Sequence, residues 1–368
     1  MIEILPADSG EMFREFLEFP YTLYRDNPHW VPQLNRDIKA LFSKDNPFFE
    51  HAEVQPFIAR KNGSTAGRIT AIYNTTYTDY YNEPVGFFGF FDCIDDLEVA
   101  RSLIDAVKNW LVSRNMTSMM GPMNFSSNEE IGVLFEGFDE PPMIMMPYNH
   151  PYYDRLYKEC GFERVRDLFA YIADVPDSFP EKVYRVARIS EKKGVSVRPI
   201  RMKHFAQEME IFREIYNSAW EKNWGFMPMT ANEINHAAKE LKSIVVPDLT
   251  LIAEHNGEAV GFMMFLPDFN YVLKKLDGRL LPFGIFKALW HTRKITDARL
   301  LLLGIKPGFR RRGVDSLLFL KGLEGLKKHG YKRMEFSWIL EDNHDVKRVI
   351  ETMNGDLYKK YRVYQCSI

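Results

Sequence analysis

Three consecutive arginines that follow a buried strand have the clearest capacity for chemistry in this chain. In the stretch KPGFRRRGVDSLL, a Pro-Gly turn leads into Arg310, Arg311 and Arg312, then Gly313 and the start of an amphipathic helix. The first turn of a helix offers N–H groups without intrahelical partners and the positive end of the helix dipole. Glycine allows close backbone approach, and arginines add charge-assisted hydrogen bonds to phosphate. The pattern predicts a phosphate-binding turn, and a solvated basic helix start without a ligand is the alternative.

Two carboxylates follow the next strand, EFSWIL. Glu341 and Asp342 are candidates for deprotonating an ammonium group. Capping of the following helix explains Asp342 and Asn343 equally well.

Three polar and aromatic clusters are candidates for an acceptor site. They lie in GPMNFSSNEEIG after a strand end, in MPYNHPYY, and in IYNSAWEKNWGF, where Trp220 and Asn223 are expected to share a helix face. Turn chemistry and core packing are the alternatives. The candidate residues are Asn124, Ser126, Asn128, Glu129, Tyr148, Asn149, Trp220, Asn223 and Trp224.

The elements that position these residues occur twice. IARKNGSTAGRITAIY at 58–73 and IAEHNGEAVGFMMFLP at 252–267 both predict a strand, an Asn-Gly turn and a second strand. Each copy continues with a strand, a helix, a strand and a helix. In the first copy the strands are 85–93 and 117–121, and the helices are one with Val99, Leu103, Val107 and Trp110 on one face and one at 152–160. In the second copy the strands are 299–305 and 333–340, and the helices are 313–329 and 346–353.

This order predicts an α/β (α+β) fold with two tandem domains, each a central mixed sheet flanked by helices. We expect domains at 1–179 and 180–368, with the boundary near Pro180, where a charged stretch follows that can itself be helical.

The second copy resembles the GCN5-related N-acetyltransferase (GNAT) superfamily. Its pyrophosphate signature is Gln or Arg, two residues, Gly, one residue, then Gly or Ala, and here the stretch from Arg310 to Asp315 reads RRRGVD. The resemblance implies a co-substrate, acetyl-CoA or a longer acyl-CoA, and no metal. By this resemblance the backbone of Leu303, Gly304 and Ile305 binds pantetheine where two strands splay apart. The residues implied at the pyrophosphate are Arg310, Arg311, Arg312, Gly313, Val314, Asp315 and Ser316, with Asn343 as the helix-start asparagine.

The chain departs from the family at two positions. Asp315 stands where the family prefers Gly or Ala, so its carboxylate would repel the diphosphate, favour the helix dipole, or contact the adenosine-side hydroxyls. The tyrosine that often serves as general acid is matched by Tyr157 in the first copy, for which plain packing is the alternative, and Ile350 takes that position in the second. The first copy also has the acidic connection CIDDLEVA in place of the basic turn, so it is expected to be a degenerate partner.

An insertion lengthens the second copy. Residues 274–294 interleave apolar residues, Leu280, Leu281, Phe283, Phe286, Leu289 and Trp290, with basic ones, Lys274, Lys275, Arg279, Lys287, Arg293 and Lys294. The pattern suits peripheral contact with a membrane surface or a lid over an acyl chain. A helix packed on the other domain explains it as well.

Composition narrows the function. Lysine and arginine number 48 against 50 acidic residues, so no overall field favours nucleic acid. The three cysteines suggest neither a zinc site nor disulfides, and the sequence is expected to be cytoplasmic, with the membrane surface as an option. The leading hypothesis is an N-acyltransferase acting on a small-molecule or lipidic amine. The alternatives are a non-catalytic module that senses acyl-CoA or binds protein, and FemAB-like aminoacyl transfer from tRNA; the oligomeric state is left open.

Overall fold

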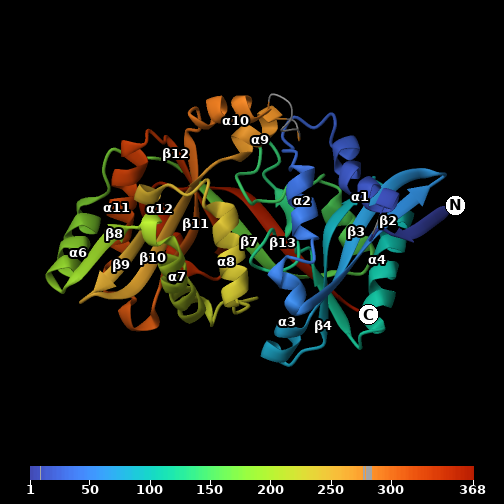
Figure 1. Cartoon of the computed structure of the whole chain (residues 1–368), viewed down its shortest axis with the longest axis horizontal. Coiled ribbons are helices and arrows are strands. Elements are labelled where there is room, and N and C mark those ends of the chain that lie inside the picture. The colour runs from blue at the N-terminus through green and yellow to red at the C-terminus, as the bar shows by residue number, and fades with distance from the viewer. Residues whose placement is uncertain (9, 277, 279–283) are drawn as a thin grey trace. The chain divides into compact units, whose positions relative to one another are not determined.

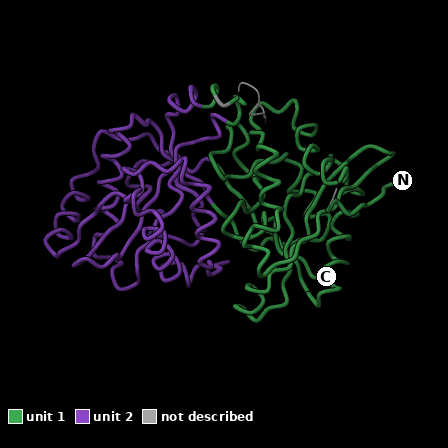
Figure 2. Tube along the Cα trace, viewed as in Figure 1, with its two compact units in different colours: residues 1–168, 273–288, 359–368 green, residues 169–272, 289–358 purple. Residues whose placement is uncertain are grey.

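A computed structural model describes residues 1–8, 10–276, 278 and 284–368 of the chain. These residues form two compact units (Figure 2), which are unit 1, residues 1–168, 273–288 and 359–368, and unit 2, residues 169–272 and 289–358. The chain thus leaves unit 1 and returns to it twice. Each unit is α/β, as predicted. The boundary at 179/180 concerns the two sequence copies and stays a prediction.

Unit 1 is built on a mixed sheet with the strand order β1-β2-β3-β4-β5-β13, and β6 pairs with β13. Neighbouring strands are antiparallel except β4 and β5, which are parallel. Its strands are β1 (Ile2–Pro6), β2 (Ala52–Lys61), β3 (Ser64–Asn74), β4 (Val85–Cys93), β5 (Ser118–Gly121), β6 (Val133–Glu136), the first part of β7 (Glu163–Asp174) and most of β13 (Asp356–Ser367). Its helices are α1 (Gly10–Leu23), α2 (Asn35–Leu41), the 3-10 turn η1 (Pro47–Glu50), α3 (Thr75–Tyr81), α4 (Leu97–Val112) and α5 (Tyr153–Glu159).

Unit 2 has the strand order β12-β11-β10-β9-β8, again with one parallel pair, β11 and β12. Its strands are β8 (Val195–Pro199), β9 (Thr250–His255), β10 (Glu258–Pro267), β11 (Asp297–Ile305) and β12 (Arg333–Leu340). Its helices are α6 (Glu181–Lys192), η2 (Met202–His204), α7 (Phe205–Trp220), α8 (Ala231–Leu241), η3 (Pro247–Leu249), η4 (Pro307–Phe309), α11 (Val314–Lys328) and α12 (His344–Thr352). Helices α9 (Asn270–Leu276) and α10 (Gly284–Thr292) each contain a point where the chain passes from one unit to the other; Figure 1 labels the two helices and Figure 2 colours the units.

The two predicted hairpins are present, one in each unit. Asn62 and Gly63 join β2 to β3, and Asn256 and Gly257 join β9 to β10. All four turn residues have positive φ, from 52° to 86°, which asparagine and glycine tolerate better than other residues. The repeat that these turns indicated is therefore a repeat of structure.

Helix α11 and helix α7 both pack on β10 in unit 2. Met263 and Phe265 of β10 belong to the core that includes Leu318 of α11, whereas the ring of Phe262 lies 4.7 Å from that of Phe212 in α7. Alternate residues of a strand point to opposite faces, so β10 is buried on both sides.

The last strand of unit 1 comes from the far end of the sequence. In β13, Tyr364 pairs with Gly121 of β5, and the Arg362 guanidinium contacts the Asp167 carboxylate at 2.7 Å and 3.0 Å. Unit 2 begins with the second half of β7, after which the Val175 N–H donates to the Lys332 carbonyl at 2.7 Å. Neither compact unit is therefore a single continuous stretch of chain.

Candidate functional site

The parallel strands β11 and β12 separate after a short paired stretch in unit 2. Their register runs only from Asp297 with Arg333 to Leu300 with Phe336. On its other side β11 stays paired with β10 as far as Ile305. Within the described residues, 301–305 thus have no register partner on β12. An open strand edge can form backbone hydrogen bonds with an extended ligand.

The open edge of β11 is followed in the sequence by η4 and then by the N-terminus of helix α11. After η4, Arg311 and Gly313 both have positive φ, 58° and 81°, and Gly313 is the N-cap of α11. Glycine supplies no side-chain cap, and the first intrahelical hydrogen bond runs from the Leu317 N–H to the Gly313 carbonyl. The preceding N–H groups, those of Val314, Asp315 and Ser316, have no carbonyl of their own helix to bind, which suits an anion.

The three arginines of this turn have different surroundings. Arg310 donates to the Ala219 carbonyl at the end of α7 and, at 3.3 Å, to the Ile305 carbonyl. The Arg312 guanidinium lies 5.1 Å from the centre of the Phe309 ring. The Arg311 side chain is 87% exposed and meets Asp345 of α12 at 3.3 Å. Arg310 therefore connects α7 to the end of β11, while Arg311 and Arg312 are exposed and can meet a ligand.

Gly313 has a packing reason as well as a conformational one. A Cβ atom there would lie 2.7 Å from Cγ1 and 3.0 Å from the carbonyl oxygen of Val186 in α6. Contact between α11 and α6 requires glycine at this position even without a phosphate, so the residue by itself does not argue for a ligand.

Trp220 and Gly304 come from different predicted sets and lie against each other. A Cβ atom on Gly304 would be 2.3 Å from the Trp220 ring, and that ring stacks on Tyr216 with centroids 4.9 Å apart. The expectation that Trp220 and Asn223 share a helix face was wrong, because α7 ends at Trp220 and Asn223 lies in the following turn, where its N–H bonds the Trp220 carbonyl. Trp224 lies in the same turn.

The carboxylate candidates lie at the turn between β12 and α12. Asn343 caps α12 by accepting from the Val346 N–H, and the Glu341 carbonyl accepts from the Lys347 ammonium at 2.5 Å. Asp342 is exposed. The contact between Arg311 and Asp345 links the start of α12 to the arginine turn.

A buried charged cluster lies where β11 and β12 are still paired. Arg299 and Glu335 are 1% and 0% exposed, and the Arg299 Nε is 3.6 Å from Glu335 Oε1. Ser337 Oγ accepts from Arg299 Nε at 2.7 Å and donates to Glu335 Oε1 at 2.5 Å, and the Tyr358 hydroxyl bonds Glu335 Oε2. Our sequence interpretation did not single out this cluster. Its signal was an arginine and a glutamate inside two strands that otherwise look fully buried, since buried charges need partners.

Comparison with known proteins identifies the family. The sequence model described as "Acetyltransferase (GNAT) family" matches residues 209–355. A protein of Caulobacter vibrioides (strain NA1000 / CB15N) named "Bacterial ceramide synthase" is 37% identical over 372 aligned positions, which cover 99% of this chain and 97% of that protein. Protein YghO of Escherichia coli (strain K12) is 34% identical over 361 positions, covering 96% and 93%.

The chain belongs to the GNAT family. It is a GNAT-type acyltransferase, and the family uses acyl-CoA as its co-substrate. A solved structure described as a tandem GNAT protein from the clavulanic acid biosynthesis pathway matches with a TM-score of 0.62 at 12% identity, covering 100% of this chain and 98% of that one. The likeness in structure confirms the predicted tandem GNAT fold.

In unit 1 the parallel strands β4 and β5 also separate, and residues 123 and 124 bond the strand edge that this leaves open. Strands β4 and β5 pair only from Val85 to Phe87. Beyond this, the Met123 N–H donates to the Phe88 carbonyl and the Asn124 side chain accepts from the Phe90 N–H, both at 2.8 Å. These bonds use the strand edge that is open in unit 2.

The helix that follows β4 has a charged cap of its own. The Asp96 carboxylate accepts from the N–H groups of Glu98 and Val99, at 3.0 Å and 3.3 Å. A carboxylate thus caps the helix start that corresponds to the arginine turn of unit 2, and the degeneracy of the first copy stays a prediction.

The acceptor candidates of unit 1 are largely engaged in local structure. Asn149 is buried and bonds both the N–H and the carbonyl of Leu134, at 2.7 Å and 3.0 Å. Asn124 donates to Glu130 at 2.9 Å, Ser126 accepts from the Asn128 N–H at 3.1 Å, and Tyr148 donates to the Phe138 carbonyl at 3.1 Å. The Glu129 N–H bonds the Ser126 carbonyl at 3.1 Å. These contacts are those of turns, and a role in substrate binding stays a prediction for all six residues.

Tyr157, the candidate acid, is enclosed in the core of unit 1. The side chain is fully buried among Phe88, Phe91, Phe162 and Tyr364, and its hydroxyl has no hydrogen-bond partner among the described residues. Burial raises the pKa of this phenol well above its ordinary value. The side chain is thus shielded from solvent by the described residues around it.

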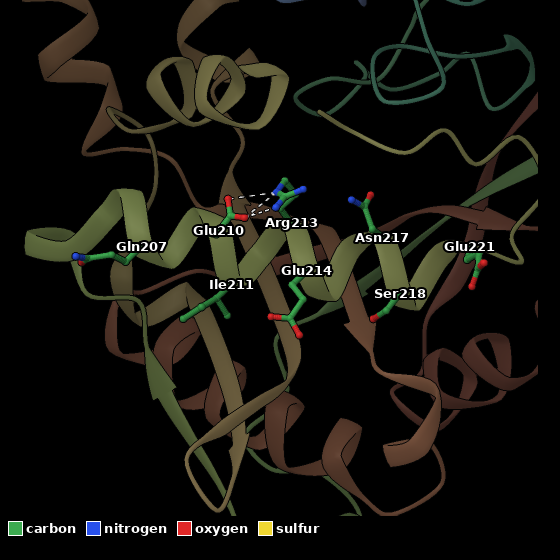
Figure 3. Close-up of a pocket in the computed structure, with 8 residues that line it drawn as sticks. All are labelled: Gln207, Glu210, Ile211, Arg213, Glu214, Asn217, Ser218 and Glu221. Carbon is green, nitrogen blue, oxygen red and sulfur yellow. Dashed lines mark hydrogen bonds and ion pairs between the residues drawn. The ribbon is translucent and has the colours of Figure 1, made fainter. Parts of the chain in front are cut away.

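A hollow of about 750 Å³ follows the outer side of α7 in unit 2 (Figure 3). Its lining residues all come from α7 and the residue after it, and they are Gln207, Glu210, Ile211, Arg213, Glu214, Asn217, Ser218 and Glu221. Arg213 pairs with Glu210, and Glu214 pairs with Lys306 at 2.6 Å. Three carboxylates on an open helix side disfavour a phosphate, so this hollow is not the candidate site.

The described residues offer neither a metal site nor a membrane-spanning helix. No group of three or more His, Cys, Asp or Glu side chains there is placed to hold a metal ion. None of the helices there combines the length and the apolar character that spanning a bilayer requires.

Proposed function

We propose that this GNAT protein transfers the acyl group of an acyl-CoA to the amine of a lipidic acceptor, with the acyl-CoA held by unit 2. The observation that carries the proposal is the open edge of β11 from Leu301 to Ile305, which leads directly into the arginine turn and the uncapped start of α11. The name of the Caulobacter relative, a ceramide synthase, favours a long-chain acceptor amine.

In the proposed complex, pantetheine lies along the backbone of Leu303, Gly304 and Ile305. The pyrophosphate lies at the first N–H groups of α11, with Arg311 and Arg312 beside it, since Arg310 is engaged with the end of α7. Trp220 covers Gly304 and forms a wall next to this path.

The proposed reaction is a direct attack of a neutral amine on the thioester carbonyl. The C–N bond forms, the C–S bond breaks, and CoA leaves as a thiolate. The ammonium form of the acceptor first gives one proton to a carboxylate or water, for which Glu341 and Asp342 are the candidates. The second amine proton neutralises the thiolate. Tyr157 has no role in this scheme because it lies in the core of unit 1.

Long acyl chains and lipidic amines reside in membranes, so we also propose that the protein works at a membrane surface through residues 274–294. Within this segment Arg279, Leu280, Leu281 and Phe283 lie outside the described residues.

Calorimetric titration with acetyl-CoA and with a long-chain acyl-CoA tests the cofactor site. The variant R311A/R312A should bind either thioester at least about tenfold more weakly, because a hydrogen bond to a charged group contributes about 1.5–3 kcal/mol. R188A on the exposed side of α6 in the same unit is the matched control and should bind normally. Equal binding by R311A/R312A and R188A would remove the arginine turn from the proposal.

Release of free CoA thiol in the presence of a long-chain amino alcohol tests the reaction. The alternative is a non-catalytic module that senses acyl-CoA or binds protein, and it is favoured by Ile350, fully buried at the position of the usual family acid. Binding of acyl-CoA without thiol release for any amine would support that module over the enzyme.

A further inference from the structure

Helix α10 presents large apolar side chains to solvent. Phe286, Leu289 and Trp290 are 75%, 64% and 58% exposed, which makes them the most exposed large hydrophobic residues described in the chain apart from Met1. Their spacing of three and four residues places them on one face of the helix. Each such side chain gains about 2 kcal/mol from burial, so a face of this kind normally finds a partner.

The charged residues of this helix and of the four residues after it have one sign. Residues 284–296 contain Lys287, Arg293 and Lys294 and not one aspartate or glutamate. All three cations are exposed, and the Lys294 ammonium lies 3.3 Å from the centre of the Trp290 ring. The partner of this face should therefore be apolar in its interior and negatively charged at its surface.

The helix is held to the protein by its other side. The ring of His291 lies 5.8 Å from that of Tyr271, and Ile295, just after the helix, is buried. The apolar face is thus supported by the fold and is available to an external surface.

We infer that α10 docks on the surface of an anionic lipid bilayer, with Phe286, Leu289 and Trp290 inserted at the level of the headgroups. Lys287, Arg293 and Lys294 then face lipid phosphates, and tryptophan is a residue that prefers this interfacial depth. The inference deepens the proposed function, since a lipidic acceptor would be met at that surface, but it concerns binding and can be tested without turnover.

Vesicle flotation with the full chain tests this docking. The protein should float with vesicles of phosphatidylcholine mixed with phosphatidylglycerol and much less with phosphatidylcholine alone. The variant F286S/L289S/W290S should lose this binding, and its exposed positions leave the core unchanged. V112S/I189S, which alters two other exposed apolar residues at 53% and 46% exposure, is the matched control and should float like the wild type.

The charge contribution has its own variant. K287Q/R293Q/K294Q should weaken binding to the anionic vesicles by roughly 100-fold, since each basic residue near such a surface contributes about 1 kcal/mol. Added salt should weaken the wild type in the same direction.

Two outcomes would overturn the inference. One is that the wild type floats with neither kind of vesicle, or floats equally well after the triple serine change. The other is a concentration-dependent dimer that the triple serine variant abolishes, because the face would then bind a second copy of the chain. Thiol release with a detergent-solubilised amine measures the proposed function separately, so loss of flotation with retained thiol release would remove only the docking.

Discussion

Arg299 and Glu335 are register partners one pair before the end of the paired stretch of two parallel strands, and both side chains are almost fully buried. Just beyond them β11 and β12 separate and the proposed path of the acyl-CoA begins. Ser337 of β12, the first residue beyond the paired stretch, bonds both partners.

Loss of one partner in this cluster should be costly. E335A should lower the free energy of unfolding by about 3–5 kcal/mol, because it leaves the Arg299 charge buried without a counterion. The double variant R299M/E335L should recover most of this loss, since apolar replacement of a whole buried pair is often neutral. Urea unfolding of the three proteins gives the answer, and a mild effect of E335A would mean that water reaches the cluster.

The contact between Gly304 and Trp220 predicts a steric conflict. The methyl group added by G304A would lie 2.3 Å from the Trp220 ring, and this clash should cost about 1–3 kcal/mol of stability. The smaller leucine side chain in W220L should relieve much of this conflict, so a double-mutant cycle of G304A and W220L should show strong coupling. Additive effects would indicate that Trp220 moves away freely.

Asp315 predicts opposite effects on binding and on stability. D315A removes a carboxylate beside the proposed diphosphate and should tighten acyl-CoA binding about two- to fivefold. The same change should lower stability by about 0.3–1 kcal/mol, since a carboxylate in the first turn of α11 favours the helix dipole. Weaker binding by D315A in calorimetry would instead assign Asp315 a contact with the adenosine-side hydroxyls.

The ion pair between Asp167 and Arg362 predicts a dependence on acid. Burial acts to raise the pKa of the Asp167 carboxyl, but the hydrogen bonds and charges of Arg362 and Arg164 together outweigh it and hold the pKa below its ordinary value of 3.8. The pair therefore stabilises unit 1 fully above the unfolded pKa and loses this effect as the pH falls through the folded pKa. D167N should be less stable than the wild type at neutral pH, and the difference should shrink below the ordinary carboxyl pKa. A difference that is constant with pH would contradict this.

The cysteines should be unreactive in the folded protein. Burial raises the pKa of Cys160 to about 11 and also raises the pKa values of Cys93 and Cys366. Because the thiolate is the reactive form, a disulfide reagent should label the native chain slowly at neutral pH and the unfolded chain rapidly at three sites. Rapid native labelling would show that a thiol is open to solvent, and it would also disturb the thiol-release assay.

The local elements could be predicted from the sequence because their signals are local. The strands at 85–93 and 333–340 have the predicted bounds, and both Asn-Gly hairpins are where the turn residues place them. The charged stretch after Pro180 forms α6. For the strands an apolar run decides the outcome, and for the hairpins a turn residue with special backbone freedom does.

The site was harder to predict because its contacts join distant residues. The sequence predicts the arginine turn, but not that Arg310 would bind the Ala219 carbonyl or that Gly313 would face Val186. The hydrogen bonds of Met123 and Asn124 with the edge of β4 in unit 1 likewise depend on a loop that returns to a strand edge. Side-chain types alone do not specify such partners.

The completion of unit 1 by strand β13 has a consequence for biosynthesis. Unit 1 needs residues 359–368, which leave the ribosome after all of unit 2 has been made. During translation the edge of β5 that will bind β13 is therefore exposed for the time needed to synthesise the more than two hundred residues between Gly121 and its partner Tyr364, at about 5–20 residues per second. The nascent chain is thus expected to depend on chaperones over that interval. A chain truncated near residue 350 would contain two incomplete units rather than one finished domain.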